Sequence, residues 1–540
     1  MSAVPVPVAP RREGDEASNG GGSMAETRNV NQAGQLPRET RHAMLQKLNP
    51  SNPLRIAVNG RPRIPPPPPP RSSIPRQAPT QVSLLSLSSL KSSLLSYRSC
   101  QQPSAANLNS RKYTNKFALF LFVLHLVASV ALAGFLVFKG IQGLVMPSSG
   151  KNSDMKMLKL FLPQAEAASL LSLLLAVLWQ QAFRYWPLYM VNVILWGSVV
   201  SSLTAGSLVI CFERAETDGL GVCLILFAIA SGLYVCWVNP RIDFCSKVLE
   251  KSLQPVPNLK DLNYPTYVML TSAFLFMSFW VFAIIGALDF YWPPVVIIVL
   301  VLSFAWTAEV MRNVVNQTIC RVVSLYYLRG MQSGTKLSFQ RALSNNLGSA
   351  CLGSLFVPTI EALRIISKGL EMLEGEDEFM FSCADCCSNV MKAVFNNGNG
   401  WAYVQIATYG KSFVRASQDT WQLFEKQKMT ALLEADITSS VCFLTGICSG
   451  SICIIVVAAW TQNVHPPYTA TVSLLAAFIG YLMTRIAMAL PQACVSCYYV
   501  CYAEDPDNSS FDKTIKDRIQ LLEGDGSVFA GTPRLPRRVS

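Results

Sequence analysis

Long apolar runs recur along this chain, and each is long enough to cross a membrane as a helix. A bilayer core about 30 Å thick needs about 20 apolar residues per helix, and its interior admits only helices and closed barrels. With 51% hydrophobic and 14% charged residues, the chain is predicted to be an all-α, polytopic helical membrane protein with about ten transmembrane helices. Eight runs qualify clearly and a ninth follows: 117–138, 165–183, 188–212, 219–238, 266–288, 294–311, 348–366, 439–460 and 469–490.

One stretch, residues 310–328, is polar although it continues the apolar run 294–311 without a break. It carries Arg312, Asn316 and Arg321 among apolar neighbours. Polar groups inside a bilayer are costly and tend to line a substrate pathway. If this stretch spans the membrane, the chain is a transporter and the stretch belongs to its route.

Charged residues between the runs predict the orientation. Basic residues occupy 111–116, before the first run, and acidic residues occupy 213–218, after the third, so the N-terminus is expected in the cytosol. Nine spans would leave the basic C-terminal tail outside. Parity therefore predicts a tenth crossing at 310–328, with both termini cytosolic. The alternative is one long helix over 294–328 that projects into the cytosol, with the missing crossing supplied by 401–413.

The chain is expected to divide into three parts. Residues 1–111, which include six prolines at 65–70, cannot bury enough apolar surface to fold alone and form a disordered Pro/Ser-rich cytosolic tail. Residues 112–503 form the transmembrane transporter domain, with an amphipathic, cysteine-containing cytosolic loop at 368–434. Residues 504–540 are a cytosolic tail. The proline run could bind an SH3- or WW-type partner or act only as a stiff tether.

Enzyme and metal signatures are missing from the sequence. It has three histidines and no GxSxG, HExxH or GxxxxGK[ST] motif, so we expect a non-enzyme with no catalytic residues and no cofactor. The Cys383, Cys386 and Cys387 cluster lacks the second ligand pair of a structural zinc site, so reduced thiols or palmitoylation are favoured over metal. The net charge of +12 suits anionic lipid rather than nucleic acid.

Four ordered motifs resemble those of the choline transporter-like proteins, a family of ten-span solute carriers. Residues 306–318 resemble the family's WT-x-EV-xx-NV-xxx-T helix, and 347–355 resemble its LGS-xxx-GSL segment. Residues 402–413 are similar to its AY-x-x-IA-xx-GK-x-F motif, and 501–505 to its C-[FY]-x-x-D exit from the last span. The resemblance runs from about residue 117 to 522. It implies facilitated transport of choline or a related organic cation, in the plasma membrane or alternatively in Golgi or endosomal membranes.

One departure from the family pattern stands at Arg321. The family helix usually continues after the position of Thr318 with small residues that include glycine, whereas Ile319, Cys320 and Arg321 follow here. An arginine at this position narrows a close helix contact or adds positive charge near a cation route.

A quaternary ammonium ion is best held by aromatic faces together with a carboxylate. The candidate acids are Glu309, for which a structural bridge to Arg312 or Arg321 is the alternative, and Glu361, for which a local pair with Arg364 is the alternative. Trp306 lies one helical turn from Glu309 and could share its face. The other candidate substrate-binding residues are Asn313, Asn316, Arg321, Trp280, Phe276, Tyr234 and Trp237.

Small residues in the second motif are expected to permit close packing or sliding of helices. They are Gly348, Ser349, Gly353 and Ser354. A second class of function stays open: a non-transporting membrane scaffold or trafficking protein that acts through its proline-rich tail and cytosolic loop.

Overall fold

The computed structural model describes residues 113–145, 152–259, 261–287, 292–373 and 396–524. All of them belong to one of the two units of the chain, residues 101–540. Every regular element in these ranges is a helix, which confirms the predicted fold class. The proline-rich tail and the Cys383–Cys387 cluster lie outside the described residues, so their predicted roles stay predictions.

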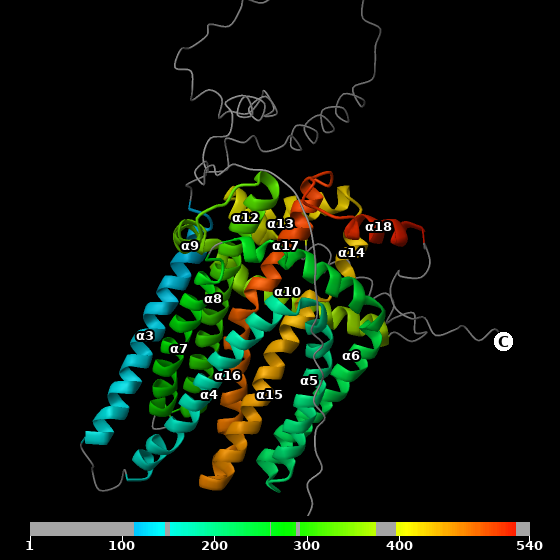
Figure 1. Cartoon of the computed structure of the whole chain (residues 1–540). Coiled ribbons are helices and arrows are strands. Elements are labelled where there is room, and N and C mark those ends of the chain that lie inside the picture. The colour runs from blue at the N-terminus through cyan, green and yellow to red at the C-terminus, as the bar shows by residue number, and fades with distance from the viewer. Residues whose placement is uncertain (1–112, 146–151, 260, 288–291, 374–395, 525–540) are drawn as a thin grey trace, which may run out of the picture. The chain divides into compact units, whose positions relative to one another are not determined.

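Eight described helices are long and apolar enough to cross a membrane, which confirms a polytopic architecture. They lie side by side in one bundle and alternate in direction (Figure 1). They are α3 (Lys116–Val145), α4 (Asn152–Tyr185), α5 (Pro187–Ile210), α6 (Ala215–Leu253), α7 (Tyr264–Ala287), α8 (Pro293–Arg329), α15 (Thr438–Val464) and α16 (Thr469–Ala487).

Shorter helices gather at one end of this bundle, which we call the capped end (Figure 1). Because the eight long helices alternate, residues 113 and 524 lie at this same end. The turns between α5 and α6 and between α15 and α16 lie at the opposite, far end, as do the last residues of α7 and the first residues of α8. The short helices are α9 (Thr335–Ser344), α12 (Ala402–Tyr409), α13 (Phe413–Lys426), α14 (Thr430–Glu434), α17 (Ala489–Glu504) and α18 (Thr514–Gly524), and single 3₁₀ turns occur at Val256–Asn258 and Pro466–Tyr468.

The polar stretch 310–328 is the second half of one continuous helix, α8, of 37 residues. At 1.5 Å per residue α8 is about 55 Å long, well beyond a bilayer core of about 30 Å. Its polar half packs among α9, α12 and α17 at the capped end. The predicted separate crossing at 310–328 is therefore wrong, because the chain does not turn back there. Most of these polar residues, among them Arg312 and Asn316, are buried by protein.

The alternative topology is confirmed in that α8 is one long helix, while its projection into the cytosol stays a prediction. The second part of the alternative, a crossing at 401–413, is wrong. Helix α12, in the segment 401–413, has only eight residues and ends at Gly410 in the left-handed conformation (φ 67°). Eight residues extend about 12 Å, which is too short for a crossing.

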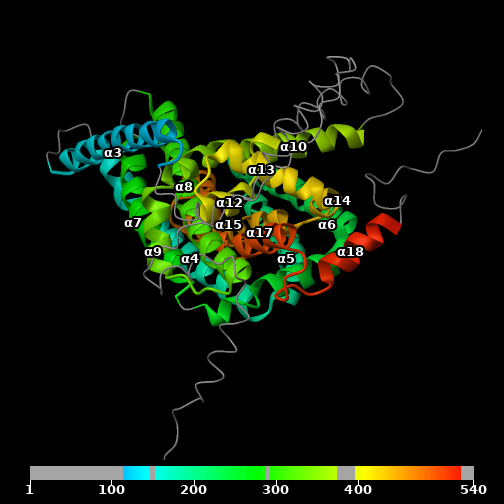
Figure 2. The same ribbon diagram turned by 90° about the horizontal axis from the view of Figure 1, so that it is seen from above.

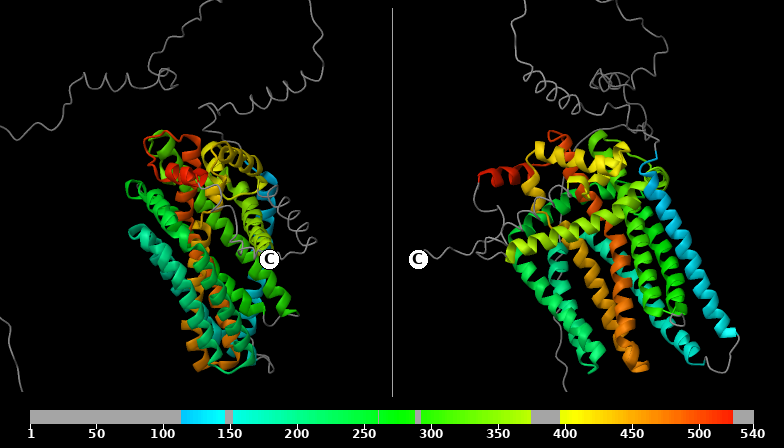
Figure 3. Two further views of the ribbon diagram at one scale, coloured as in Figure 1. Left: turned by 90° about the vertical axis from the view of Figure 1, so that its right-hand side faces the viewer. Right: turned by 180° about the vertical axis from the view of Figure 1, so that it is seen from behind.

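Helix α10 (Leu347–Leu373) explains why no tenth crossing is needed. The helix has 27 residues, and its described side chains Leu347–Ile360 are mainly apolar, so composition does not exclude the predicted span 348–366. However, α10 lies obliquely across the outside of the bundle and packs on α3 and α8 (Figure 3). Without α10 the described helices that could cross number eight, which is even, so both described ends fall on one side.

The last helix pair forms the centre of the molecule. Helices α16 and α17 are interrupted only at Met488, and α17 lies in the middle of the bundle seen from the capped end (Figure 2). From Ala489 to Ala503 α17 is buried almost throughout. It packs along the second half of α8, where Cys497 Sγ donates to the carbonyl of Cys320 at 3.5 Å.

Candidate functional site

Glu309 lies at the centre of a buried charge network between α8, α16 and α17. Its Oε1 accepts hydrogen bonds from Arg312, one turn along α8, and from Arg485 Nη2 of α16 at 3.3 Å. The side chains of Glu309, Arg312 and Arg485 are 12%, 5% and 11% exposed. Arg312 also donates through Nη2 to Gln492 Oε1 of α17 at 2.5 Å. Three helices are thus tied together by one carboxylate and two guanidinium groups.

This pairing decides what Glu309 can do in the described conformation. With both arginines present the network carries a net charge of one positive unit, so the carboxylate is already compensated. The pair of Glu309 with Arg312 is the structural bridge that the sequence offered as the alternative role of Glu309. The second partner of Glu309 is Arg485 and not Arg321. Glu309 can meet a substrate cation only when one arginine moves away, and its role as a substrate ligand stays a prediction.

A second face of the polar half of α8 contacts α10 and α12. Asn313 Nδ2 donates to the carbonyl of Ala350 at 3.5 Å, and Arg321 Nη1 donates to that of Ala407 at 2.8 Å. Ala407 lies in the last turn of α12, where carbonyl groups lack helical partners and a cation is favourable. Arg321 therefore links two helices through the position where the family usually has a small residue.

Unpaired polar atoms mark the same half of α8. Both amide atoms of Gln317 and the Oδ1 atom of Asn313 are buried and have no hydrogen-bond partner among the described residues. Asn316 differs, because its Oδ1 accepts a bond from Cys320 Sγ at 3.1 Å within α8 itself. Buried polar atoms without partners are rare and usually bind water or a ligand.

Four aromatic side chains pack together on the far-end side of the Glu309 network. We call them the aromatic cluster: Phe276, Trp280, Phe304 and Phe478. Phe276 stacks on Trp280 at 5.0 Å and on Phe304 at 5.8 Å between ring centroids, and Phe304 meets Phe478 edge-on at 6.1 Å. Trp280 Nε1 donates to the carbonyl of Leu300 at 2.6 Å. The cluster joins α7, α8 and α16, with Phe304 five residues before Glu309.

The sequence identified half of this cluster. Phe276 and Trp280 were among the candidates, whereas Phe304 and Phe478 look like ordinary apolar residues within spans. Only the packing of α8 and α16 against α7 brings the four rings together.

Trp306 belongs to a different contact from Glu309, so the predicted shared face is wrong. Its Nε1 donates to Ser354 Oγ of α10 at 2.9 Å, and its ring lies 4.5 Å from that of His125 in α3. His125 in turn is 3.1 Å from Ser303 Oγ. Trp306 thus connects α8 with α3 and α10, whereas Glu309 faces α16 and α17.

The remaining candidates lie elsewhere. On α6, Tyr234 and Trp237 are 6.0 Å apart, and the guanidinium of Arg241 lies 4.4 Å from the centroid of the Trp237 ring. That face of Trp237 is therefore already occupied by a cation. Glu361 lies within α10, but its side chain is outside the described residues.

The small residues of α10 are at two close helix contacts. A Cβ atom on Gly348 would lie 2.2 Å from the carbonyl oxygen of Thr114, and one on Gly353 would lie 2.1 Å from the hydroxyl of Tyr403. Ser349 Oγ donates to Thr114 Oγ1 at 2.7 Å, and Ser354 accepts the bond from Trp306. These contacts leave no room for a side chain at either glycine.

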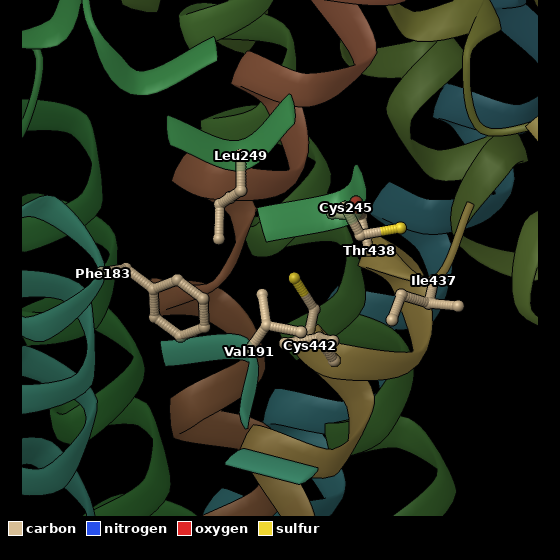
Figure 4. Close-up of a pocket in the computed structure, with 8 residues that line it drawn as sticks. Phe183, Val191, Cys245, Leu249, Ile437, Thr438 and Cys442 are labelled. Carbon is tan, nitrogen blue, oxygen red and sulfur yellow. The ribbon is translucent and has the colours of Figure 1, made fainter. Parts of the chain in front are cut away.

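A small cavity lies where α4, α5, α6 and α15 meet (Figure 4). Its volume of about 10 Å³ is just enough for one water molecule, so it does not hold a quaternary amine. Its lining is mostly apolar and consists of Phe183, Val191, Cys245, Leu249, Ile437, Thr438, Val441 and Cys442.

Glu166 of α4 is an intramembrane acid that the sequence analysis passed over. Its Oε2 accepts a hydrogen bond from Ser278 Oγ of α7 at 2.9 Å, while its Oε1 is buried without a partner among the described residues. The sequence signal was the one that singled out Glu309, an acid within an apolar run. Glu166 is the second residue of the predicted run 165–183, but it was not among the predicted site residues.

Comparison with protein families finds a match to the plasma-membrane choline transporter family over residues 222–507, just over half of the chain. The chain is 24% identical over 226 residues to Protein PNS1 of Mycosarcoma maydis, covering 39% of this chain and 43% of that protein. It is 29% identical over 224 residues to Protein PNS1 of Cryptococcus neoformans, covering 38% and 41%. A CTL-like protein of Dictyostelium discoideum is 22% identical over 303 residues, covering 53% and 54%. The matched part of the chain thus spans about two fifths to a half of the length of these relatives.

Proposed function

The chain belongs to the plasma-membrane choline transporter family, and on this basis we propose that it carries choline or a related organic cation across the membrane. Membership gives the class of activity, transport of a small molecule by a multi-pass membrane protein. The observation that supports a cationic substrate is the aromatic cluster. A quaternary ammonium ion cannot donate hydrogen bonds and is held by aromatic faces at about 0.5–2 kcal/mol each.

The Glu309 network is suited to gate this site. It joins α8 to α16 and α17 one to two turns from the aromatic cluster, at the boundary between the apolar and polar halves of α8. When Arg485 moves away from Glu309, the carboxylate is exposed to a cation on the aromatic cluster. When the pair reforms, the positive charge of the network repels the cation. Two discrete arrangements of packed helices are what alternating access requires.

We propose that the capped end faces the cytosol. The described capped end carries many lysines and arginines in α9, α13 and the C-terminal part of α6, whereas acidic residues dominate the turn between α5 and α6 at the far end. This asymmetry follows the positive-inside rule. The family description favours the plasma membrane as the location.

Uptake of labelled choline by cells expressing the chain tests this function. We expect saturable uptake that unlabelled quaternary amines inhibit. Phe276→Leu removes one aromatic face and keeps an apolar side chain, so KM should rise about 2- to 30-fold. The matched control is Trp196→Leu, an aromatic residue of α5 that is 53% exposed, which should leave KM unchanged. Wild-type protein at the surface that takes up no quaternary amine would contradict transport and favour the scaffold alternative.

A further inference from the structure

We propose that Glu166 is the carboxylate that binds the ammonium group of the transported organic cation when it enters from the far end. This inference rests on the proposed function and adds a binding residue to it. The first observation is the unused carboxylate oxygen. Glu166 Oε2 accepts from Ser278 Oγ at 2.9 Å, and Oε1 is buried without a hydrogen-bond partner among the described residues.

The second observation is that the helices around α4 offer Glu166 no basic residue. Helices α5, α7, α15 and α17 contain no lysine or arginine, and the single arginine of α16, Arg485, is bound to Glu309. No ion pair of Glu166 occurs among the described side chains. Glu309 has two guanidinium partners, whereas Glu166 has no ion-pair partner among the described side chains, to which Lys156 and Lys159 of α4 itself do not belong. An unpaired acid in a membrane bundle is costly and is expected at an ion or substrate pathway.

The third observation is the position of Glu166 relative to the aromatic cluster. Its donor Ser278 lies on α7 between Phe276 and Trp280 in sequence, so the carboxylate lies at the same height along α7 as two rings of the cluster. Residues two apart on a helix do not share a face, so the carboxylate and the rings lie on different sides of α7. Helices α4, α7 and α16 contact one another pairwise. A cation that leaves the carboxylate therefore has to pass from the side of α7 that carries Ser278 to the side that carries the rings. Glu309, on α8, lies further toward the capped end.

These positions define an order of charges along the bundle. From the far end, a cation meets an unpaired carboxylate, then aromatic faces, then the net positive Glu309 network. The first two groups attract a cation, and the third holds it back until Arg485 moves. Carboxylate and aromatic faces together are the chemistry that recognises a quaternary ammonium ion.

The test measures cation binding and uptake separately, with Glu166→Gln, Glu166→Asp and Ser278→Ala. Binding is read as the shift in unfolding temperature of the purified full-length protein caused by choline chloride or tetramethylammonium chloride, relative to sodium chloride. We expect Glu166→Gln to lose this shift and to raise the KM for choline at least about tenfold. Glu166→Asp should recover part of both, and Ser278→Ala should have a smaller effect. The control Glu216→Gln changes an exposed acid at the far end and should behave as wild type.

The outcomes separate this inference from the proposed function. If wild type binds organic cations through Glu166 but transports none, the inference holds and the transport function fails. If wild type transports choline and Glu166→Gln keeps its KM and its thermal shift, the inference fails and the function stands. If Glu166→Gln changes only the pH dependence of uptake, Glu166 is a proton site and the inference is overturned. Absence of any shift in wild type overturns it as well. If Glu166→Gln does not fold, the Glu166→Asp and Ser278→Ala measurements decide.

Discussion

Glu309 is buried between Arg312 and Arg485, and removing its charge leaves two guanidinium groups close together without compensation. Breaking a buried ion pair by changing one partner typically costs about 3–5 kcal/mol. We therefore expect Glu309→Gln to lower the unfolding temperature of the purified protein strongly. Thermal unfolding in detergent measures this effect. In the double variant Glu309→Gln with Arg485→Gln, part of the loss should be recovered, because one unpaired charge is also removed.

The control for this prediction is Glu216→Gln, an exposed acid for which no large change is expected. A Glu309→Gln protein that unfolds at the wild-type temperature would show that the network does not hold α8 to α16. Uptake by the same variant would then report on substrate binding alone.

The sequence predicted the members of this network unequally. Glu309 and Arg312 are three residues apart on one helix, so their pairing follows from helical geometry. Arg485 is 176 residues away, and nothing in its local sequence connects it with Glu309. The same limit applies to Phe304 and Phe478, whose apolar character is equally compatible with contact to lipid. Long-range partners depend on how the helices pack.

At the scale of single elements, the contact of α10 with α12 depends on Gly353. A Cβ atom there would lie 2.1 Å from the Tyr403 hydroxyl and 2.8 Å from the Phe413 ring. Gly353→Ala should therefore destabilise the protein by about 1–3 kcal/mol, measured by thermal unfolding. Gly134→Ala in α3 is the matched control, because nothing lies within 4 Å of its Cβ position. If both variants behave alike, the close contact does not matter.

The contact between α12 and α17 is expected to depend on pH. Tyr409 donates a hydrogen bond to Glu504 Oε1, and burial raises the pKa of the Glu504 carboxyl, partly offset by this bond. Burial also raises the pKa of Tyr409, so the phenol keeps its proton. A carboxyl whose pKa is raised by folding contributes stability below its ordinary pKa and loses it as the pH rises through the folded value.

Wild type should therefore lose stability relative to Glu504→Gln as the pH rises from about 5 to about 8. The measurement is the difference in unfolding temperature between the two proteins at each pH. Taking this difference cancels groups such as Asp512, whose pKa is lowered because hydrogen bonds from Tyr498 and Thr514 outweigh its burial. A difference that is constant across this range would contradict the assignment to Glu504.

Elements were predicted well where apolar length alone decides the outcome, and less well where it does not. The runs 188–212 and 439–460 match α5 and α15 closely. The run 348–366 is apolar enough to suggest a span, yet composition does not distinguish a crossing helix from one that lies across a bundle. For residues 310–328 the sequence predicted a separate crossing that does not exist. Their polar side chains pack against α9, α12 and α17 in the second half of one long helix.

For the whole molecule, eight crossing helices that alternate in direction predict on which side of the membrane each of three positions lies. Position 332, in the turn after α8, lies at the capped end, and position 213 lies in the turn between α5 and α6 at the far end. Position 371 tests α10, because it would lie with 213 if α10 crossed the membrane and with 332 if it does not. Cysteines introduced singly at these sites report their side through a membrane-impermeant maleimide. The background lacks Cys211, Cys223 and Cys236, which are exposed among the described residues, and also Cys100, Cys383, Cys386 and Cys387, which lie outside them.

With the capped end in the cytosol, reagent added to intact cells should label Glu213→Cys and should label Gln332→Cys and Glu371→Cys only after permeabilisation. This result is expected if eight helices cross the membrane and α10 does not. Labelling of Glu371→Cys together with Glu213→Cys, but not Gln332→Cys, in intact cells would mean that α10 crosses, and a further crossing would then be needed to return the chain to α12. Labelling of Gln332→Cys and Glu371→Cys but not Glu213→Cys in intact cells would mean that the orientation of the bundle is reversed, and the entry route past Glu166 would then face the cytosol.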